Sequence, residues 1–201
     1  MARLIHYYAH PGHRYSHTNR AMLEATRALA GITRVDLYGE YPRHDIDIDR
    51  EQERLLGHDL IVLQFPLFWY SSPSLVKEWI DLTFENGFAY GEGGDKLAGK
   101  WLMLAITTAG AREGYAVDGH QRHSLRTYLT PFEQTARLSQ MRFAAPYVRH
   151  SALRTDPVAH ASGFATLLTA LRDDRYDLGQ AESAEIVTVD DLPSFTAGRP
   201  K

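Results

Sequence analysis

The 201-residue sequence contains no cysteine. This absence excludes disulfide bridges, cysteine nucleophiles and thiolate metal sites. No apolar run approaches the roughly 20 residues that span a bilayer, and the N-terminus lacks the uninterrupted apolar core of a signal peptide. The formal net charge of -3 gives no basic footprint for nucleic acid. These absences predict a cytoplasmic protein that neither binds nucleic acid nor inserts directly into a membrane.

What is present is ordinary globular composition, with 44% hydrophobic and 23% charged residues. Such values argue against a disordered, collagen-like or coiled-coil chain. Residues 1–172 carry the regular apolar pattern and are predicted to form one domain. The stretch 173–201 is polar apart from one apolar patch at 186–189, so we expect an extension that wraps the domain or a partner and forms no domain of its own.

Short apolar runs predict the strands. The runs 60–63 and 102–106 do not alternate with polar residues, which is typical of strands covered on both faces in a parallel sheet. A weaker run covers 143–148, and 33–38 alternates. The predicted strands are 4–9, 33–38, 61–65, 102–107 and 143–148.

Helical patterns separate these runs. The expected helices cover 19–30, 49–56 and 74–84, and two more begin at Thr130-Pro131 and Asp156-Pro157. The first of these two starts has capping-box spacing, with Glu133 three residues after Thr130. Five strand–helix repeats predict a doubly wound parallel sheet. In such sheets the ligand lies at the carboxyl ends of the strands, which directs attention to three loops.

The first loop covers 10–19 and runs from a strand into a helix. Ser16, Thr18 and Asn19 can donate hydrogen bonds at that helix start, an arrangement that suits a phosphate, and His10 or Arg14 could add charge. A simple helix cap with a solvated loop explains the same residues equally well. The loop matches neither a Gly-x-Gly-x-x-Gly nor a P-loop pattern.

The first loop also holds the three histidines His10, His13 and His17. No carboxylate accompanies them there, and metal sites need defined ligand geometry. The prediction is therefore no metal.

The second loop, 64–73, places Phe68, Trp69 and Tyr70 in succession after a buried strand. Three consecutive aromatic side chains cannot all point into one core, so at least one is expected to face a crevice that takes a flat ring. The third loop, 107–115, is rich in small residues that let the backbone approach a ligand closely. A packed strand end and a mobile surface loop are the plainer alternatives for these two segments.

Together these segments resemble a known family. Residues 65–81, Phe-Pro-Leu-Phe-Trp-Tyr-Ser-Ser-Pro-Ser-Leu-Val-Lys-Glu-Trp-Ile-Asp, resemble the hallmark segment of the flavodoxin-like NAD(P)H:quinone oxidoreductases. The segments 87–91, 97–100 and 107–110 match that family in order and spacing. The first loop and the Asp-Ile-Asp segment at 45–49 are most similar to the glutathione-regulated potassium-efflux ancillary proteins. The resemblance covers residues 3–172.

The resemblance implies a flavodoxin-like, five-stranded parallel sheet of order 2-1-3-4-5 with helices on both faces. It also implies a bound flavin, FMN in preference to FAD. The flavin phosphate would be held by His10, Ser16, His17, Thr18 and Asn19. The isoalloxazine would be flanked by Leu67, Phe68, Trp69 and Tyr70. Its polar edge would meet Thr107, Thr108, Ala109 and Gly110, where Ala109 replaces the family's usual first glycine.

The same resemblance suggests catalytic residues. Tyr115 lies at the spacing of a family tyrosine that assists flavin reduction. His120 lies one residue short of the spacing of the family histidine. The implied activity is two-electron hydride transfer from NADH or NADPH through the flavin to a quinone, with ping-pong kinetics.

The family's sites form at a two-fold interface, so a homodimer is implied, with residues 68–70 and 84–90 as the contact. The main alternative is a regulatory ancillary subunit of a glutathione-gated potassium-efflux transporter, peripheral at the inner membrane through that partner. A single-electron carrier of the flavodoxin kind is a weaker alternative. A hydrolase is disfavoured because no Gly-x-Ser-x-Gly elbow is present.

Overall fold

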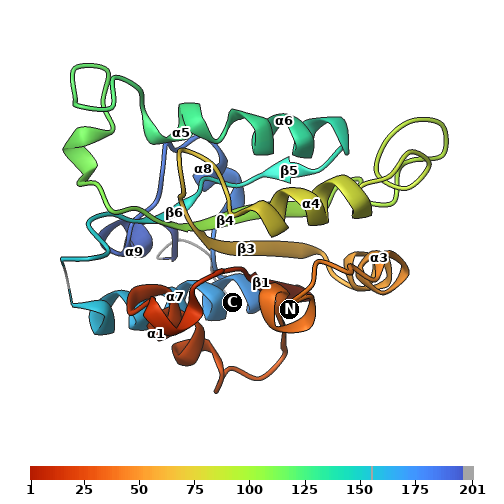
Figure 1. Ribbon diagram of the computed structural model, residues 1–201, viewed down its shortest axis with the longest axis horizontal. Coiled ribbons are helices and arrows are strands. Elements are labelled where there is room, and N and C mark those ends of the chain that lie inside the picture. The colour runs from red at the N-terminus through yellow and green to blue at the C-terminus, as the bar shows by residue number, and fades with distance from the viewer. Residues whose placement is uncertain (155, 197–201) are drawn as a thin grey trace.

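A parallel β-sheet with helices on both faces forms the core of the computed structural model, which describes residues 1–154 and 156–196 (Figure 1). The strand order is β2-β1-β3-β4-β5, and a further strand, β6, also pairs with β4. The strands are β1 Leu4–Tyr8, β2 Ile32–Asp36, β3 Leu60–Pro66, β4 Trp101–Thr107, β5 Arg142–Phe143 and β6 Tyr147–Arg149. The predicted doubly wound sheet of order 2-1-3-4-5 is therefore confirmed.

The fifth position of the sheet is divided between two short strands. β5 pairs with Trp101 and Leu102 at the start of β4, and β6 pairs with residues 105–107 at its end. Pro146 lies just before β6 and has no N–H to donate to β4. The predicted single run 143–148 is interrupted for this reason, and β6 still carries the chain to the carboxyl edge of the sheet.

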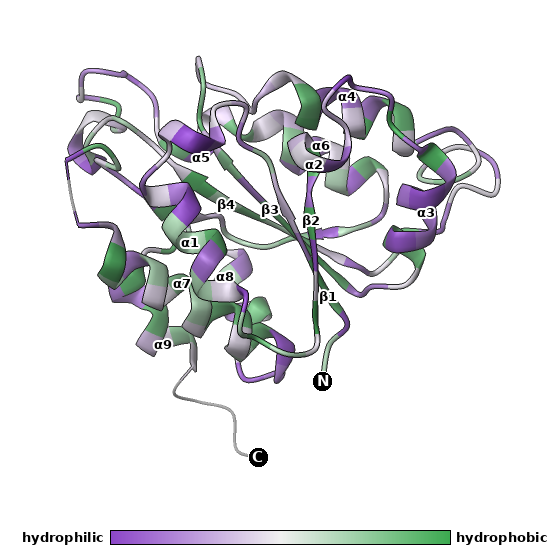
Figure 2. Ribbon diagram, turned by 60° about the horizontal axis from the view of Figure 1, so that its bottom comes forward, coloured by the Kyte–Doolittle hydropathy of each residue, from purple (hydrophilic) through white to green (hydrophobic). Residues whose placement is uncertain are grey.

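Two helical layers cover the sheet. Figure 1 shows α1 and α7 on one side of the strands and α4, α5 and α6 on the other. Figure 2 shows that α3 is largely hydrophilic, whereas β4 and α7 are largely hydrophobic. The helices of the main domain are α1 Thr18–Thr26, α2 Leu37–Glu40, α3 Ile48–Leu56, α4 Ser74–Thr83, α5 Leu125–Tyr128, α6 Thr130–Leu138 and α7 Pro157–Arg172.

Alternation along β1 divides the core into two clusters. Ile5 and Tyr7 pack in the cluster beneath α3, α4 and α6, whereas Leu4 packs with Phe164 of α7 in the other. All residues of β1, β3 and most of β4 are buried. This burial agrees with the absence of polar alternation in β3 and β4 and confirms that both faces of the sheet are covered.

The two predicted helix starts differ in outcome. At α7, the Asp156 side chain accepts a hydrogen bond from Val158 N and Pro157 is the first helical residue, as the sequence predicts. At α6, the expected capping box does not form. Thr130 is already helical, because α5 runs almost directly into α6 and Leu129 O accepts the N–H groups of Phe132 and Glu133.

The C-terminal extension packs back on the domain as far as residue 196. It contains α8 Leu178–Glu182 and α9 Leu192–Thr196, and a short 3-10 turn at Val189–Asp191 leads directly into α9. Val187 bridges to Tyr147 of β6 and is fully buried. Residues 197–201 of the predicted extension lie outside the described residues. Within residues 1–154 and 156–196, no helix has the length and apolar character required to span a membrane.

Candidate functional site

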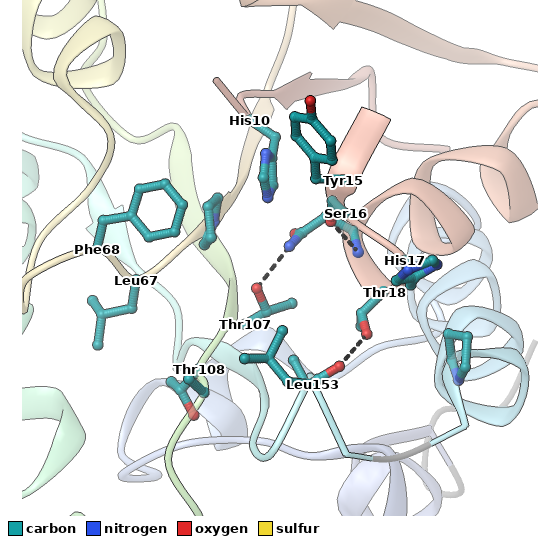
Figure 3. Close-up of a pocket in the computed structure, with 15 residues that line it drawn as sticks. His10, Tyr15, Ser16, His17, Thr18, Leu67, Phe68, Thr107, Thr108 and Leu153 are labelled. Carbon is teal, nitrogen blue, oxygen red and sulfur yellow. Dashed lines mark hydrogen bonds between the residues drawn. The ribbon is translucent and has the colours of Figure 1, made fainter. Parts of the chain in front are cut away.

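A cavity of about 500 Å³ opens at the carboxyl ends of β1, β3 and β4 (Figure 3). Its size lies within the roughly 300–1,000 Å³ typical of small-molecule sites. The location agrees with the rule for doubly wound sheets. The lining residues are His10, Tyr15, Ser16, His17, Thr18, Asn19, Pro66, Leu67, Phe68, Thr107, Thr108, Ala109, Ala152, Leu153 and Pro157.

The three predicted loops meet at this cavity. Every predicted cofactor-binding residue lines it except Trp69, Tyr70 and Gly110. The loops are brought together because parallel strands end at the same edge of the sheet. Backbone hydrogen bonds join them there, from Ala9 N to Gln64 O at 2.8 Å and from Leu67 N to Thr107 O at 2.9 Å.

The first loop brings the N-terminus of the nine-residue helix α1 to the cavity. Ser16 Oγ accepts a hydrogen bond from Asn19 N at 3.2 Å, which leaves the serine proton free to donate. His17 and Thr18 lie where the first N–H groups of a helix have no partner inside the helix. Free N–H groups, the helix dipole and a hydroxyl together suit an anion such as a phosphate.

His10 is a neutral hydrogen-bond donor at the same end of the cavity. Its Nδ1 accepts from Gly12 N at 3.1 Å, so Nε2 carries the proton. Burial lowers the pKa of His10, which favours the neutral ring. The ring meets Phe68 edge to face, with 5.8 Å between centroids. His10 thus connects the phosphate end with the aromatic wall.

Thr18 and Asn19 link the loops to one another. Thr18 Oγ1 donates to Ala152 O at 2.7 Å and Asn19 Nδ2 donates to Thr107 Oγ1 at 2.7 Å, both shown as dashed lines in Figure 3. The Thr18 hydroxyl proton is therefore already used inside the protein. Of the hydroxyls predicted to hold a phosphate, Ser16 has the free donor.

A buried polar chain continues from Asn19 into the sheet. Gln64 Nε2 donates to Asn19 O at 3.0 Å and to Asn19 Oδ1 at 3.2 Å. Gln64 Oε1 therefore acts as the acceptor for His6 Nε2, 2.9 Å away. Desolvation lowers the pKa of the fully buried His6 to about 4. The chain is uncharged at neutral pH and fixes the loop after β1 to β3 and β4.

The second loop is a tight turn in a strained conformation. Phe68 and Ser71 exchange backbone hydrogen bonds of 2.9 and 3.0 Å, and the two residues between them have positive φ, 48° for Trp69 and 66° for Tyr70. Such two-residue turns favour Asn-Gly, because bulky residues with positive φ are strained. Phe68 lines the cavity, Trp69 is 92% exposed and Tyr70 packs on Tyr128. The prediction that one of the three aromatic residues faces a crevice agrees with the position of Phe68.

The third loop carries Tyr115, which does not line the 500 Å³ cavity but a small chamber beside it. A Cβ at Gly110 would lie 3.1 Å from Tyr115 Cε2, so the absence of a side chain lets the ring lie against the loop. Burial raises the pKa of Tyr115, and a hydrogen bond with Thr108 lowers it by a smaller amount. Ala109 has no positive φ. Replacement of the family's glycine by alanine therefore introduces no backbone strain.

The histidine beside Tyr115 is not the one that the sequence suggested. His120 is exposed and does not line the cavity. His150, just after β6, lies 5.6 Å from Tyr115 between ring centroids, and its Nδ1 is 3.2 Å from Thr108 Oγ1. Desolvation lowers the pKa of His150 to about 4. Sequence spacing along one loop could not reveal a residue that a later strand supplies.

A fourth wall of the cavity also escaped the sequence interpretation. Ala152, Leu153 and Pro157 line it from the segment after β6. The sequence did offer a signal for this wall. Ligands bind at the carboxyl ends of parallel strands, and this applies to the predicted strand 143–148 as much as to the three strands that precede the predicted loops. Among residues 1–154 and 156–196, no group of three His, Asp or Glu side chains is placed to hold a metal ion.

Comparison with known proteins identifies the family. Residues 2–172 match a family model described as a flavodoxin-like fold. The chain belongs to this flavodoxin-like family. The glutathione-regulated potassium-efflux system ancillary protein KefG of Enterobacter sp. (strain 638) is 42% identical over 161 residues, which cover 80% of this chain and 88% of the relative.

Solved structures extend the likeness. General stress protein 14 of Treponema denticola, solved in complex with FMN, is 30% identical with a TM-score of 0.77 and covers 86% of this chain and 98% of its own. An NADPH-quinone reductase from P. pentosaceus is 26% identical with a TM-score of 0.75 and covers 85% of this chain and 97% of its own.

Proposed function

We propose that this flavodoxin-like protein is a flavin-dependent NAD(P)H:quinone oxidoreductase. The observation that carries the proposal is a single cavity with a helix N-terminus and a free serine donor at one end and Phe68 at the other. An anion site next to an apolar wall suits a planar ring with a phosphate tail. A relative solved with FMN and another described as an NADPH-quinone reductase support this assignment.

The residues present fit such a group. Ser16, His17 and the N–H groups at the start of α1 would bind the phosphate, with His10 as a neutral donor. Leu67 and Phe68 would flank the ring, and the 107–110 segment would meet its polar edge. We favour FMN over FAD, because the relative with the higher TM-score of the two compared was solved with FMN. Either NADH or NADPH would serve as reductant.

A bound flavin would supply hydride transfer, receiving two electrons from a nicotinamide and passing them to a quinone. The chain's own residues orient and stabilise the reactants. Tyr115 keeps its proton at neutral pH, because burial raises its pKa. Because Thr108 Oγ1 gives its proton to Gly110 O, the phenol donates to Thr108, which lines the cavity. During reduction the phenol would turn this proton toward negative charge that develops in the cavity. One shared slot for nicotinamide and quinone would give ping-pong kinetics.

The test combines spectroscopy and turnover. Protein from flavin-replete cells should be yellow, release FMN on denaturation and reduce a benzoquinone with parallel double-reciprocal lines. Tyr115→Phe should slow turnover by about a hundredfold, the low end for loss of a transition-state donor, whereas Val117→Ala, at an 83%-exposed position shortly after the same loop, should not. A colourless protein that refuses both FMN and FAD would refute the proposal, and intersecting lines would refute the shared slot.

A homodimer is part of the proposal. Several large aromatic side chains are exposed, although such side chains are usually buried. The exposed fraction is 42% for Phe68, 92% for Trp69, 43% for Tyr70 and 39% for Tyr90. An exposed group of this kind is typical of an interface. Light scattering at micromolar concentration should give the dimer mass, and Trp69→Asn should shift it toward the monomer. A monomeric native protein would contradict this part.

A second candidate function rests on the 42% identity to KefG. The protein would then act in the cytoplasm as an ancillary subunit docked on a potassium-efflux transporter at the inner membrane. Co-purification with such a transporter, together with an absence of quinone turnover, would favour this alternative. Turnover by the isolated protein would favour the enzyme.

A further inference from the structure

The C-terminal extension lies beyond the family match, which ends at residue 172, yet it is firmly attached to the domain. Tyr176 and Val187 are buried to 1% and 0% exposure. Thr188 and Asp191 form a capping box, with the Asp191 carboxylate accepting from Thr188 N at 2.8 Å and Thr188 Oγ1 at 2.7 Å. A Cβ at Gly163 of α7 would lie 2.3 Å from Val189 Cγ2, so the helix has a glycine where the extension packs.

The extension pairs with the outer edge of β6. Val148 N donates to Val187 O at 2.8 Å, and Val187 N donates to Pro146 O at 2.9 Å. The other edge of β6 pairs with β4. The three-residue strand is therefore held between β4 and the extension, and its carboxyl end leads directly to His150.

His150 in turn joins β6 to the loop after β4. Thr108 Oγ1 donates to Gly110 O at 2.8 Å, so His150 Nδ1 is the donor in its 3.2 Å contact with Thr108 Oγ1. Backbone hydrogen bonds run in parallel with this contact, from Thr108 N to Arg149 O and from Ala152 N to Thr108 O. Thr108 and Ala152 both line the flavin-sized cavity.

The extension also closes the space behind this contact. A small chamber of about 90 Å³ is lined by Tyr115, Leu125 and His150 on the domain side, by Arg112 of the loop after β4, and by Glu185 and Ile186 of the extension. The charged and titratable groups that face His150 are Arg112, Glu113, Arg149, Tyr115 and Glu185.

We infer that the extension is a working part of the site: by pairing with β6 and closing the chamber, it holds His150 as a positioning residue against Thr108 and Tyr115. The pairing with β6 and the closure of the chamber both act on the position of the His150 ring. They thereby fix the Nδ1 donor from which Thr108 Oγ1 accepts a hydrogen bond. Without them, β6 would lose one of the two partners that hold it in place, and His150, directly after it, would be held less firmly. This inference rests on the proposed flavin site.

The experiment uses the full-length chain and two mild substitutions in the extension, Ile186→Ala and Val187→Ala. Ser194→Ala, at an exposed position of α9, is the matched control. The His150 imidazole signal is assigned by its loss in His150→Gln and followed by NMR from pH 3 to 8 without flavin. FMN affinity is measured separately by quenching of flavin fluorescence.

In the native protein the His150 midpoint should lie well below the 6.5 of a free imidazole. Both substitutions in the extension should move it toward that value and weaken FMN binding by roughly three- to tenfold, the value of one hydrogen bond. His150→Asn, which can still donate to Thr108, should bind FMN better than His150→Leu. Ser194→Ala should match the native protein in both measurements.

The two outcomes that would overturn the inference are distinct. An unchanged His150 midpoint in both variants would show that the extension does not hold the ring. A shifted midpoint with native FMN affinity would show that the ring's position does not matter to the site. If the native protein binds no flavin at all, the proposed function fails, and the inference that the extension serves a flavin site fails with it. If the His150 midpoint still shifts in the two variants, the flavin assignment is wrong, but the extension does hold His150.

Discussion

Neighbouring residues of β1 begin two buried polar networks on opposite faces of the sheet. His6 points toward α7, where its ring meets Phe164, and starts the uncharged chain through Gln64 and Asn19 to Thr107. Tyr7 points to the other face and donates to Glu51 of α3 at 2.8 Å. Both networks are buried, but only the first reaches the cavity.

The Glu51 network concentrates charge. Its carboxylate is 0% exposed and accepts hydrogen bonds from Tyr7, from Tyr41 at 2.6 Å, from Trp79 Nε1 at 3.1 Å and from Arg54 at 2.6 Å. Arg54 also pairs with Glu40 at 2.9 Å. The network joins β1, α3 and α4, and each carboxylate oxygen has two donors.

The difference between the faces has a physical reason. A buried carboxylate is tolerated where donors surround it, but it would repel a phosphate placed nearby. The α1/α7 face, which carries the proposed anion site, is held by neutral amide, hydroxyl and imidazole groups. The α3/α4 face carries no such site and can hold a buried charge. Structure and binding therefore make different demands on the two networks.

The largest expected effect comes from Glu51→Ala. Removal of the carboxylate leaves the Arg54 charge, two phenols and an indole N–H without this partner, and loss of one member of a buried ion pair costs about 3–5 kcal/mol. Urea denaturation should show this loss in the free energy of unfolding. FMN affinity of the remaining folded protein should stay within about twofold of native, less than one hydrogen bond would change it.

Glu53→Ala, at an exposed position of the same helix, is the control and should change stability by less than about 0.5 kcal/mol. If Glu51→Ala weakened FMN binding as strongly as it weakened folding, the two faces would not be independent, and the comparison would break.

The second effect is a dependence of stability on pH from His6. Its pKa is lowered to about 4 in the folded protein, from 6.5 when unfolded. Between these values the unfolded chain takes up the proton more readily, so stability present above pH 6.5 is lost as pH falls toward 4, by about 2–3 kcal/mol. Denaturation midpoints measured from pH 7.5 to 4.5 would record the slope.

His6→Gln keeps a donor for Gln64 and should flatten part of that slope, whereas His120→Gln at an exposed position should not. His150 and His160, with pKa values lowered to about 4 and 3, contribute to the same window, as does His10, whose pKa burial also lowers. Asp59, whose pKa is lowered to about 2 by Arg3, acts only below it. If the slope of stability against pH were the same in His6→Gln as in the native protein, His6 would not contribute to the pH dependence of stability.

The smallest effect is expected from Thr107→Val. The substitution keeps the side chain's shape and removes the acceptor for Asn19 Nδ2, at a cost of about 1 kcal/mol in unfolding free energy. Because Thr107 and Asn19 both line the cavity, FMN binding should weaken by a few-fold. Thr107→Ser should restore both quantities. If Thr107→Val lost stability but bound FMN normally, the Asn19–Thr107 hydrogen bond would serve folding alone, as the Glu51 network does.

The local patterns explain why the fold could be predicted. Apolar runs without alternation at 60–63 and 102–106 indicate strands buried on both faces, and the helical stripe of α4 is buried as its spacing predicts. Capping was less predictable. The Thr130 start looked like a capping box, but the position of the preceding α5 supplied the acceptor instead.

The site was predictable where it lies close to a strand end in the sequence. Ser16, Phe68 and Thr108 line the cavity for that reason. His150 and Ala152 were missed, because their role depends on β6 lying beside β4, more than 40 residues away in the chain. The conformation of Trp69 also escaped prediction, since nothing in the residue type favours positive φ.

The sequence alone determined the period and order of apolar runs, and therefore the parallel sheet and the edge where a ligand would bind. Those are consequences of local geometry and burial. Only the tertiary structure decided which side chains at that edge keep a free donor, which histidine meets Tyr115 and where the extension returns to the sheet. Each of these depends on contacts between residues distant in the chain, which no local pattern records.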